Sequence, residues 1–149
     1  MTSDKPGMSL IVKTVTRLTV GLILLYGIYI VLHGHISPGG GFAGGVIIAL
    51  SFIHLMLAFG RKATLQRISK PVISLLESAG ALLFLAIPLI GFMAGYFFKD
   101  WFISKGRPFD LFSAGTIPLS NMAIALKVSM GLFAIFFVLV LLKFTKDDK

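Results

Sequence analysis

The sequence predicts an all-α integral membrane protein with four transmembrane helices. Hydrophobic residues make up 56% of its 149 residues and charged residues only 13%, whereas a soluble domain carries about 25% charged residues. The mean hydropathy is +0.94. Four apolar stretches approach or exceed the roughly 20 residues that a helix needs to cross a bilayer. The composition therefore excludes an ordinary soluble domain, and residues 1–149 are predicted to form a single transmembrane domain.

The four helices are expected over residues 10–33, 42–59, 72–98 and 117–144. The first combines the apolar run 18–32 with an earlier apolar segment that starts at residue 10. Each stretch is far longer than a buried strand and is apolar on all sides instead of alternating. No small-residue cleavage site follows the first run, so we expect this helix to be retained and not removed as a signal peptide.

Lysine and arginine residues are distributed unequally over the loops. Ten lie at the N-terminus, between the second and third helices, and at the C-terminus, whereas three lie between the third and fourth helices. Because cytoplasmic loops carry the excess of Lys and Arg, both termini are predicted to be cytoplasmic in a multi-pass protein of the cell membrane. Contact with an anionic membrane surface explains the net charge of +8, so no nucleic-acid partner is expected.

The segment GHISPGGGFAGG, residues 34–45, is the most distinctive part of the sequence. Pro38 biases the residue before it away from helix, and the three glycines that follow permit positive φ and close backbone approach. Glycines four residues apart let another helix come close in lipid. Such pairs are Gly40–Gly44, Gly41–Gly45 and Gly91–Gly95. A tight turn between two helices is the plainer explanation of the segment, and a phosphate-binding loop is excluded because no Gly-Lys-Ser/Thr ending follows.

The same segment resembles the signature of the MnhB/MrpB family, whose members are membrane subunits of Mrp-type multisubunit cation/proton antiporters. That signature is Gly-His-x-x-Pro-Gly-Gly-Gly-Phe-x-x-Gly. It is met at Gly34, His35, Pro38, Gly39, Gly40, Gly41, Phe42 and Gly45. The resemblance implies an accessory membrane subunit of an Na⁺/proton antiporter module, with no cofactor or metal of its own. Its implied partners are other membrane subunits and the lipid bilayer.

The family is also found in membrane-bound hydrogenases and related respiratory complexes, which couple redox chemistry to ion translocation. The second half of the sequence looks more like this branch. Lys127 stands where some antiporter members have an acidic residue, and Glu77 has no counterpart in the antiporter pattern. Both host complexes therefore stay open, as do the ion that is moved and the coupling stoichiometry.

Three ionisable residues inside the predicted helices are candidates for an ion or proton path: Lys127, Glu77 and His54. An ionisable side chain at the centre of a membrane helix costs roughly 2.5–3.5 kcal/mol, so it usually faces a polar partner. Counted from the helix ends, Lys127 and Glu77 are expected at different depths. The alternative is that these two residues have only structural roles. Glu77 would then pair with Lys70 or Arg67 near the cytoplasmic side, and Lys127 would face a carboxylate of a neighbouring subunit.

Hydrogen bonding is the plainer explanation of the histidines. His54 is expected to bond to a neighbouring helix, with a proton relay as the alternative. His33 and His35 are expected to bond to the backbone of the glycine-rich turn, because no further metal ligand accompanies them. Catalysis within this chain is not expected, since the sequence has no cysteine and a single glutamate, Glu77. A self-contained transporter is disfavoured because neither a repeat nor paired broken helices are visible.

Overall fold

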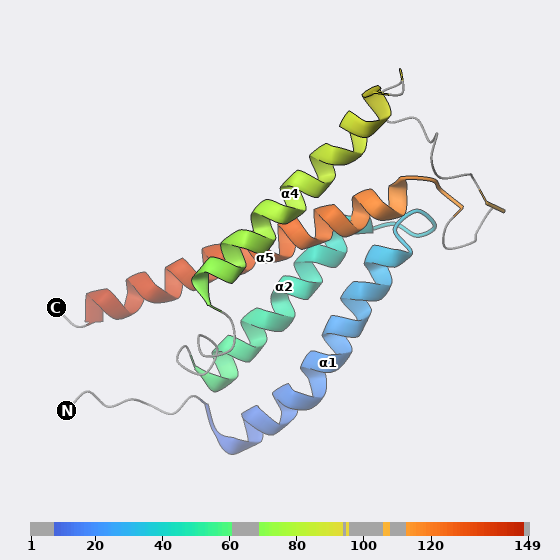
Figure 1. Ribbon diagram of the computed structural model, residues 1–149. Coiled ribbons are helices and arrows are strands. Elements are labelled where there is room, and N and C mark those ends of the chain that lie inside the picture. Colours follow the sequence, from blue (N-terminus) through green and yellow to red (C-terminus); the bar gives the residue numbers. More distant parts are fainter. Residues whose placement is uncertain (1–7, 61–68, 94, 96–105, 108–112, 148–149) are drawn as a thin grey trace.

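The computed structural model describes residues 8–60, 69–93, 95, 106–107 and 113–147. These residues form four α-helices: α1 (Leu10–Leu32), α2 (Gly40–Phe59), α4 (Lys70–Met93) and α5 (Ile117–Asp147) (Figure 1). Each helix is long and apolar enough to cross a membrane. The prediction of an all-α chain with four such helices is confirmed. The side of the membrane on which the termini lie stays a prediction.

The helix bounds differ from the expected ones mainly at the ends. Helix α2 begins two residues early, inside the glycine run, and α5 continues three residues further, to Asp147. Helix α4 begins at Lys70 and is described to Met93, short of the expected residue 98. Gly95 has a φ of 85° and its amide donates to the carbonyl of Phe92, so the chain turns there. Residues 96–98 of the expected helix lie outside the described residues.

The helices run alternately up and down. In the described part of the chain, α1 packs on α2, α2 packs on α5, and α4 packs on α5, with a smaller contact between α1 and α5. Figure 1 shows α4 crossing over α5 and then diverging from the other helices toward its C-terminal end. Helix α4 therefore depends on α5 for its packing, and much of its surface stays uncovered.

The core joins α2, α4 and α5 near the end where α2 finishes and α4 begins. Its buried members are Met56, Ile73, Met130, Phe133 and Phe137. Phe133 is 1% exposed. Because lipid tails are as apolar as these side chains, such a cluster gains its stability mainly from close van der Waals packing. The positions where helices come closest are therefore the ones that hold this fold together.

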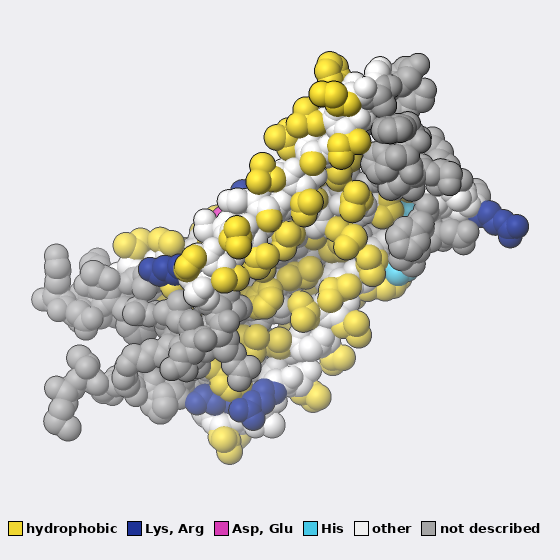
Figure 2. Space-filling view, viewed as in Figure 1, with side chains coloured by type: hydrophobic (Ala, Val, Ile, Leu, Met, Phe, Trp, Pro, Cys, Tyr) yellow, Lys and Arg dark blue, Asp and Glu magenta, His cyan; other side chains and the backbone are white. Residues whose placement is uncertain are grey.

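The outer surface is apolar in the middle and basic toward the ends. In Figure 2, hydrophobic side chains cover most of the visible face, while most dark blue Lys and Arg side chains lie near the ends of the molecule. A small magenta and blue spot interrupts the apolar surface above α5.

Candidate functional site

The glycine-rich segment forms the turn between α1 and α2 and the first turn of α2. The amides of Ile36 and Ser37 donate to the carbonyl of His33, at 2.9 and 2.8 Å. Gly39 and Gly40 have φ values of 138° and 63°, which residues with a side chain rarely adopt. The expected tight turn with positive φ is therefore confirmed, and glycine is required at both positions.

Asn121 on α5 fits against this turn. The amide of Gly41 donates to Oδ1 of Asn121 at 3.3 Å, so one of the N-terminal amides of α2 that lacks a partner within the helix is satisfied by another helix. A Cβ on Gly41 would overlap the Asn121 backbone, at 2.9 Å from its Cα, and a Cβ on Gly34 would lie 2.7 Å from Asn121 Nδ2. The glycine motif thus provides the space in which α5 is seated.

Sequence reasoning missed Asn121. The available signal was a hydrogen-bonding side chain in the second turn of a mostly apolar helix, since Asn121 follows Ile117 by four residues. Its Nδ2 atom is buried and has no hydrogen-bond partner among the described residues. Asn121 is consequently tied to the motif by one hydrogen bond and by its tight fit between the glycines.

The expected close approaches of α2 are confirmed. A Cβ on Gly44 would lie 2.9 Å from the carbonyl oxygen of Gly27 on α1, and a Cβ on Gly45 would lie 3.0 Å from the carbonyl oxygen of Ala125 on α5. One glycine spacing was misinterpreted. Gly95 lies beyond α4, and no described residue lies within 4 Å of a Cβ built there, so Gly91 and Gly95 do not form a packing pair within one helix.

Lys127 and Glu77 form an ion pair between α5 and α4. The distance from Lys127 Nζ to Glu77 Oε1 is 2.6 Å. The expected difference in depth does not keep the two charged groups apart, whereas the pairing of Glu77 with Lys70 is wrong. Lys70 Nζ instead lies 5.5 Å from the centre of the Phe137 ring. Arg67 lies outside the described residues.

The pairing arises because the N-terminal end of α4 does not lie beside the C-terminal end of α5. Lys70, at the start of α4, lies beside Phe137, and α5 continues for ten residues beyond Phe137. Glu77 is seven residues beyond Lys70 and Lys127 is ten residues before Phe137, so at 1.5 Å per residue the two backbones differ in height by only about 4–5 Å. The long lysine side chain spans this remaining distance.

Two glycines border the pair, and one of them makes room for it. A Cβ on Gly80 would lie 2.7 Å from the backbone nitrogen of Lys127, and a Cβ on Gly131 would lie 3.5 Å from Glu77 Oε1. The absence of a side chain at Gly80 lets α4 approach the α5 backbone closely. A Cβ on Gly131 would make only an ordinary contact, so this glycine borders the carboxylate without being required for the pairing.

The ion pair lies on the outer surface of this chain. The side chain of Lys127 is 47% exposed and that of Glu77 is 32% exposed. Lys127 also lies near the middle of the apolar span Ile117–Val140. Ionisable groups at this depth usually face a polar partner. Among the described residues of this chain, neither group of the pair has a further charged partner.

His54 lies at a different interface. Its Nε2 atom is 3.1 Å from the hydroxyl oxygen of Thr16 on α1, and Thr16 is 1% exposed. The expected interhelical hydrogen bond is confirmed. Of the three path candidates, the structure brings Lys127 and Glu77 together between α4 and α5, and it places His54 between α1 and α2.

His33 bonds differently from the expectation. His33 Nδ1 donates to the carbonyl of Tyr29 at 3.0 Å, and the two rings stack with their centroids 4.1 Å apart. His33 therefore bonds back to α1 and not to the glycine backbone. Among the described residues, no group of three or more His, Cys, Asp or Glu side chains could hold a metal ion.

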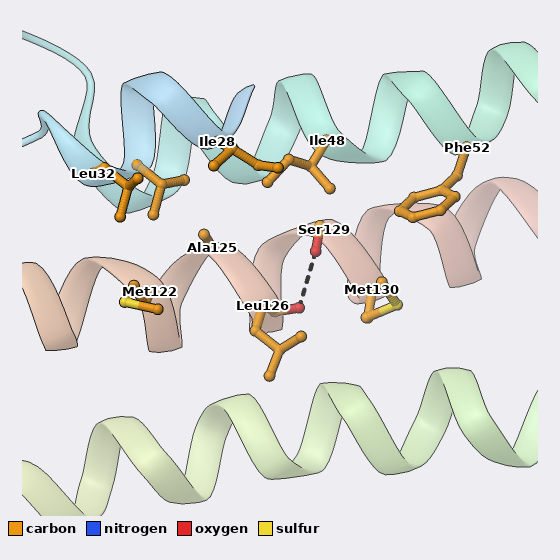
Figure 3. A pocket seen from close by; sticks show the side chains of 10 residues that line it. Ile28, Leu32, Ile48, Phe52, Met122, Ala125, Leu126, Ser129 and Met130 are labelled. Carbon is orange, nitrogen blue, oxygen red and sulfur yellow. Dashed lines mark hydrogen bonds between the residues drawn. The ribbon is translucent and has the colours of Figure 1, made fainter. Parts of the chain in front are cut away.

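A groove of about 280 Å³ lies between α1, α2 and α5. Figure 3 shows its lining, with Ile28 and Leu32 on α1, Ile48 and Phe52 on α2, and the remaining labelled side chains on α5. Ser129 is the polar member of this lining, and its hydroxyl donates to the carbonyl of Leu126 at 3.2 Å. The groove contains none of the ionisable candidates, so it offers no polar route for an ion.

Residues 11–134 match the protein family described as "Domain related to MnhB subunit of Na+/H+ antiporter". The chain belongs to this MnhB family. The resemblance of the glycine-rich segment to that family is thereby confirmed.

Curated relatives support the MnhB assignment. The chain is 40% identical over 124 residues to an uncharacterized protein of Methanocaldococcus jannaschii, covering 79% of this chain and 47% of that protein. It is 44% identical over 55 residues to the "Putative antiporter subunit mnhB2" of Staphylococcus saprophyticus, covering 37% of this chain and 39% of that protein. These matches span about half or less of the relatives' own lengths.

A solved structure extends the likeness over most of the MnhB-family chain. It is the structure of the membrane-bound sulfane sulfur reductase, an archaeal respiratory membrane complex. One chain of that complex aligns with a TM-score of 0.77 and 33% identity, covering 91% of this chain and 59% of that chain.

Proposed function

We propose that this MnhB-family chain is an accessory membrane subunit of a multisubunit complex that exchanges Na⁺ for protons. In this proposal the chain performs no catalysis itself, lies in the cell membrane with both termini cytoplasmic, and contributes its four helices to a single membrane domain. Its family membership and the antiporter subunits among its relatives support this assignment.

One observation carries the accessory role: the Glu77–Lys127 pair is open on the outer surface of the chain. A self-sufficient transporter encloses its ionisable groups in its own cavity, whereas here the groove is apolar and the ion pair lies outside it. Ionisable residues in membranes almost always face a protein interior or water-filled cavity. A neighbouring subunit is the natural source of that interior.

A second candidate places the same kind of module in a redox-driven respiratory complex. The observation that favours it is the extent of the structural likeness, since the chain of the sulfane sulfur reductase complex aligns over 91% of this chain. The antiporter subunit from Staphylococcus saprophyticus aligns over 37%. In both candidates this chain is a non-catalytic membrane subunit, and redox chemistry, where present, belongs to its partners.

Within either complex, we assign two roles to the described residues. The glycine motif seats α5 against α2 and so supports assembly. The Glu77–Lys127 pair is the better candidate for contact with an ion or proton path, because its two groups are charged and accessible from outside the chain. His54 is the weaker candidate, because its ring is engaged with Thr16.

Purification of the tagged chain from its native membranes tests the proposal. We expect other membrane subunits of an ion-translocating complex to copurify, and mass spectrometry identifies them. Additional iron–sulfur or nickel–iron subunits would assign the chain to a respiratory complex, and their absence to an antiporter. Recovery of the chain without any other membrane subunit, at the mild detergent concentration that preserves such complexes, would contradict the proposal.

A further inference from the structure

We infer that the α4–α5 surface around the ion pair is a docking site for a transmembrane helix of a partner subunit, and that this helix presents a carboxylate to Lys127. This inference rests on the proposed function and specifies where, and by what chemistry, the partner binds. The surface, called the polar face below, consists of Ser74, Glu77, Ser78, Ala81, Lys127 and Gly131.

The hydrogen-bonding capacity of Lys127 is incompletely used. An ammonium group has three donors, and among the described residues Glu77 Oε1 is the acceptor that Lys127 Nζ contacts. Glu77 is less exposed than Lys127, at 32% against 47%. More of the Lys127 side chain than of the Glu77 side chain therefore faces outward, and a negatively charged group on the partner complements the ammonium.

Lipid is an unsuitable neighbour for this cation. Lys127 lies ten residues after Ile117 and thirteen before Val140, which is about 15 and 20 Å from the two ends of the apolar span. Because the ammonium is held by Glu77 at 2.6 Å, it is not extended toward a lipid headgroup. Acyl chains offer no hydrogen-bond acceptor, so the partner is a protein segment.

The residues beside Glu77 suit a close helix contact. Ser74, Ser78 and Ala81 are exposed, and their spacing of four and three residues puts them on one side of α4. Small residues let a second helix backbone approach closely in lipid, and serine hydroxyls add interhelical hydrogen bonds. On α5, Gly131 borders the carboxylate of Glu77, since a Cβ built there would lie 3.5 Å from Oε1.

The first part of the test locates the partner by crosslinking in membranes that contain the whole complex. A photoreactive amino acid replaces Leu85, an exposed residue one turn beyond Ala81, or Leu22, an exposed control on α1. We expect Leu85 to yield an adduct with a partner subunit, mapping to a transmembrane segment that contains Asp or Glu, and Leu22 to yield far less of it.

The second part tests the chemistry by substitution. Lys127→Met is expected to lower the yield of assembled complex about tenfold, equivalent to roughly 1.4 kcal/mol, at an equal level of this chain in the membrane. Lys127→Arg keeps the cation and is expected to keep the yield. The double variant Glu77→Lys/Lys127→Glu retains an ion pair within the chain but places a carboxylate opposite the carboxylate of the partner. Because the two repel each other, the yield of assembled complex is expected to be as low as for Lys127→Met.

Three outcomes would overturn the inference. One is that Leu85 yields only lipid adducts while the chain still copurifies with other membrane subunits; the proposed function then stands and the polar face is wrongly assigned. Another is that the charge-reversed double variant restores assembly, because the pair then acts only within this chain. The third is that no partner copurifies with the unmodified chain, which contradicts the proposed function and the docking site together.

Discussion

The backbone amide of Gly41 at the start of α2 donates to the side-chain oxygen of Asn121 on α5, at 3.3 Å. Around this hydrogen bond the two backbones come so close that a Cβ on Gly41 would overlap Asn121. The glycine-rich segment is thereby linked to a residue of α5 that lies 80 positions later in the sequence. A change at Gly41 is therefore expected to disturb the packing of α2 against α5.

Gly41→Val is expected to destabilise the chain by at least about 1–3 kcal/mol, because overpacking at a close helix contact forces the backbones apart. The matched control is Gly21→Val on α1, where nothing lies within 4 Å of a Cβ. Thermal unfolding in detergent and the yield of assembled complex measure the effect. His33→Ala and His35→Ala are expected to be milder than Gly41→Val. Equal stability of the Gly41 and Gly21 variants would contradict this account of the motif.

His54 and Thr16 are expected to contribute one modest interhelical hydrogen bond. Polar contacts of this kind within membranes average about 0.6 kcal/mol, so His54→Phe and Thr16→Val should each cost little. A double-mutant cycle measures their coupling. Coupling near zero would show that the two side chains do not stabilise one another. Loss of ion transport in His54→Phe with normal transport in Thr16→Val would instead assign His54 a proton-transfer role.

Lys127 is expected to be needed for transport as well as for assembly. Lys127→Arg retains the positive charge beside Glu77, but a guanidinium stays protonated near neutral pH. If the lysine takes part in proton transfer, this variant assembles normally and transports poorly. The measurement is ion exchange by the purified complex in proteoliposomes, normalised to complex content. Full transport by Lys127→Arg would restrict the residue to a structural role.

The sequence allowed the four helices to be predicted, because an apolar run of this length identifies a membrane helix without knowledge of its neighbours. The glycine turn was predictable for a similar reason, since positive φ is a local requirement. The Glu77–Lys127 pair was not. The pair forms because the start of α4 lies partway along α5 and not beside its end, as the contact of Lys70 with Phe137 shows. No local sequence pattern indicates how far one helix is shifted along another.

The contact with Asn121 was missed for the same reason. Glycine indicates that a neighbour comes close, but it does not identify that neighbour. Gly95 illustrates the opposite error, because a spacing of four residues was interpreted as helix packing where the chain in fact turns with a φ of 85°. The sequence indicated that α2 has close neighbours and that His54 bonds to another helix, but it did not identify which residues lie opposite them.

The topology is expected to be N-in and C-in. In the structure, Arg17 lies 5.3 Å from the ring of Phe59, the last residue of α2, and Lys70 lies beside Phe137 of α5. Both basic residues therefore lie toward the side on which α2 and α5 finish. Because the chain has no cysteine, single cysteines at Ser37 and Ser69 report on the two sides. A membrane-impermeant maleimide should label Ser37→Cys in intact cells and Ser69→Cys only after permeabilisation. The reverse pattern would invert the topology.

Transport by the isolated chain tests the central claim most directly. The purified chain and the intact complex are each reconstituted into proteoliposomes, and Na⁺-dependent dissipation of an imposed pH gradient is recorded at equal amounts of this subunit. We expect exchange by the complex and none by the chain alone, because the Glu77–Lys127 pair is open at the surface and the groove between α1, α2 and α5 is apolar. Robust Na⁺/proton exchange by the chain alone would contradict it.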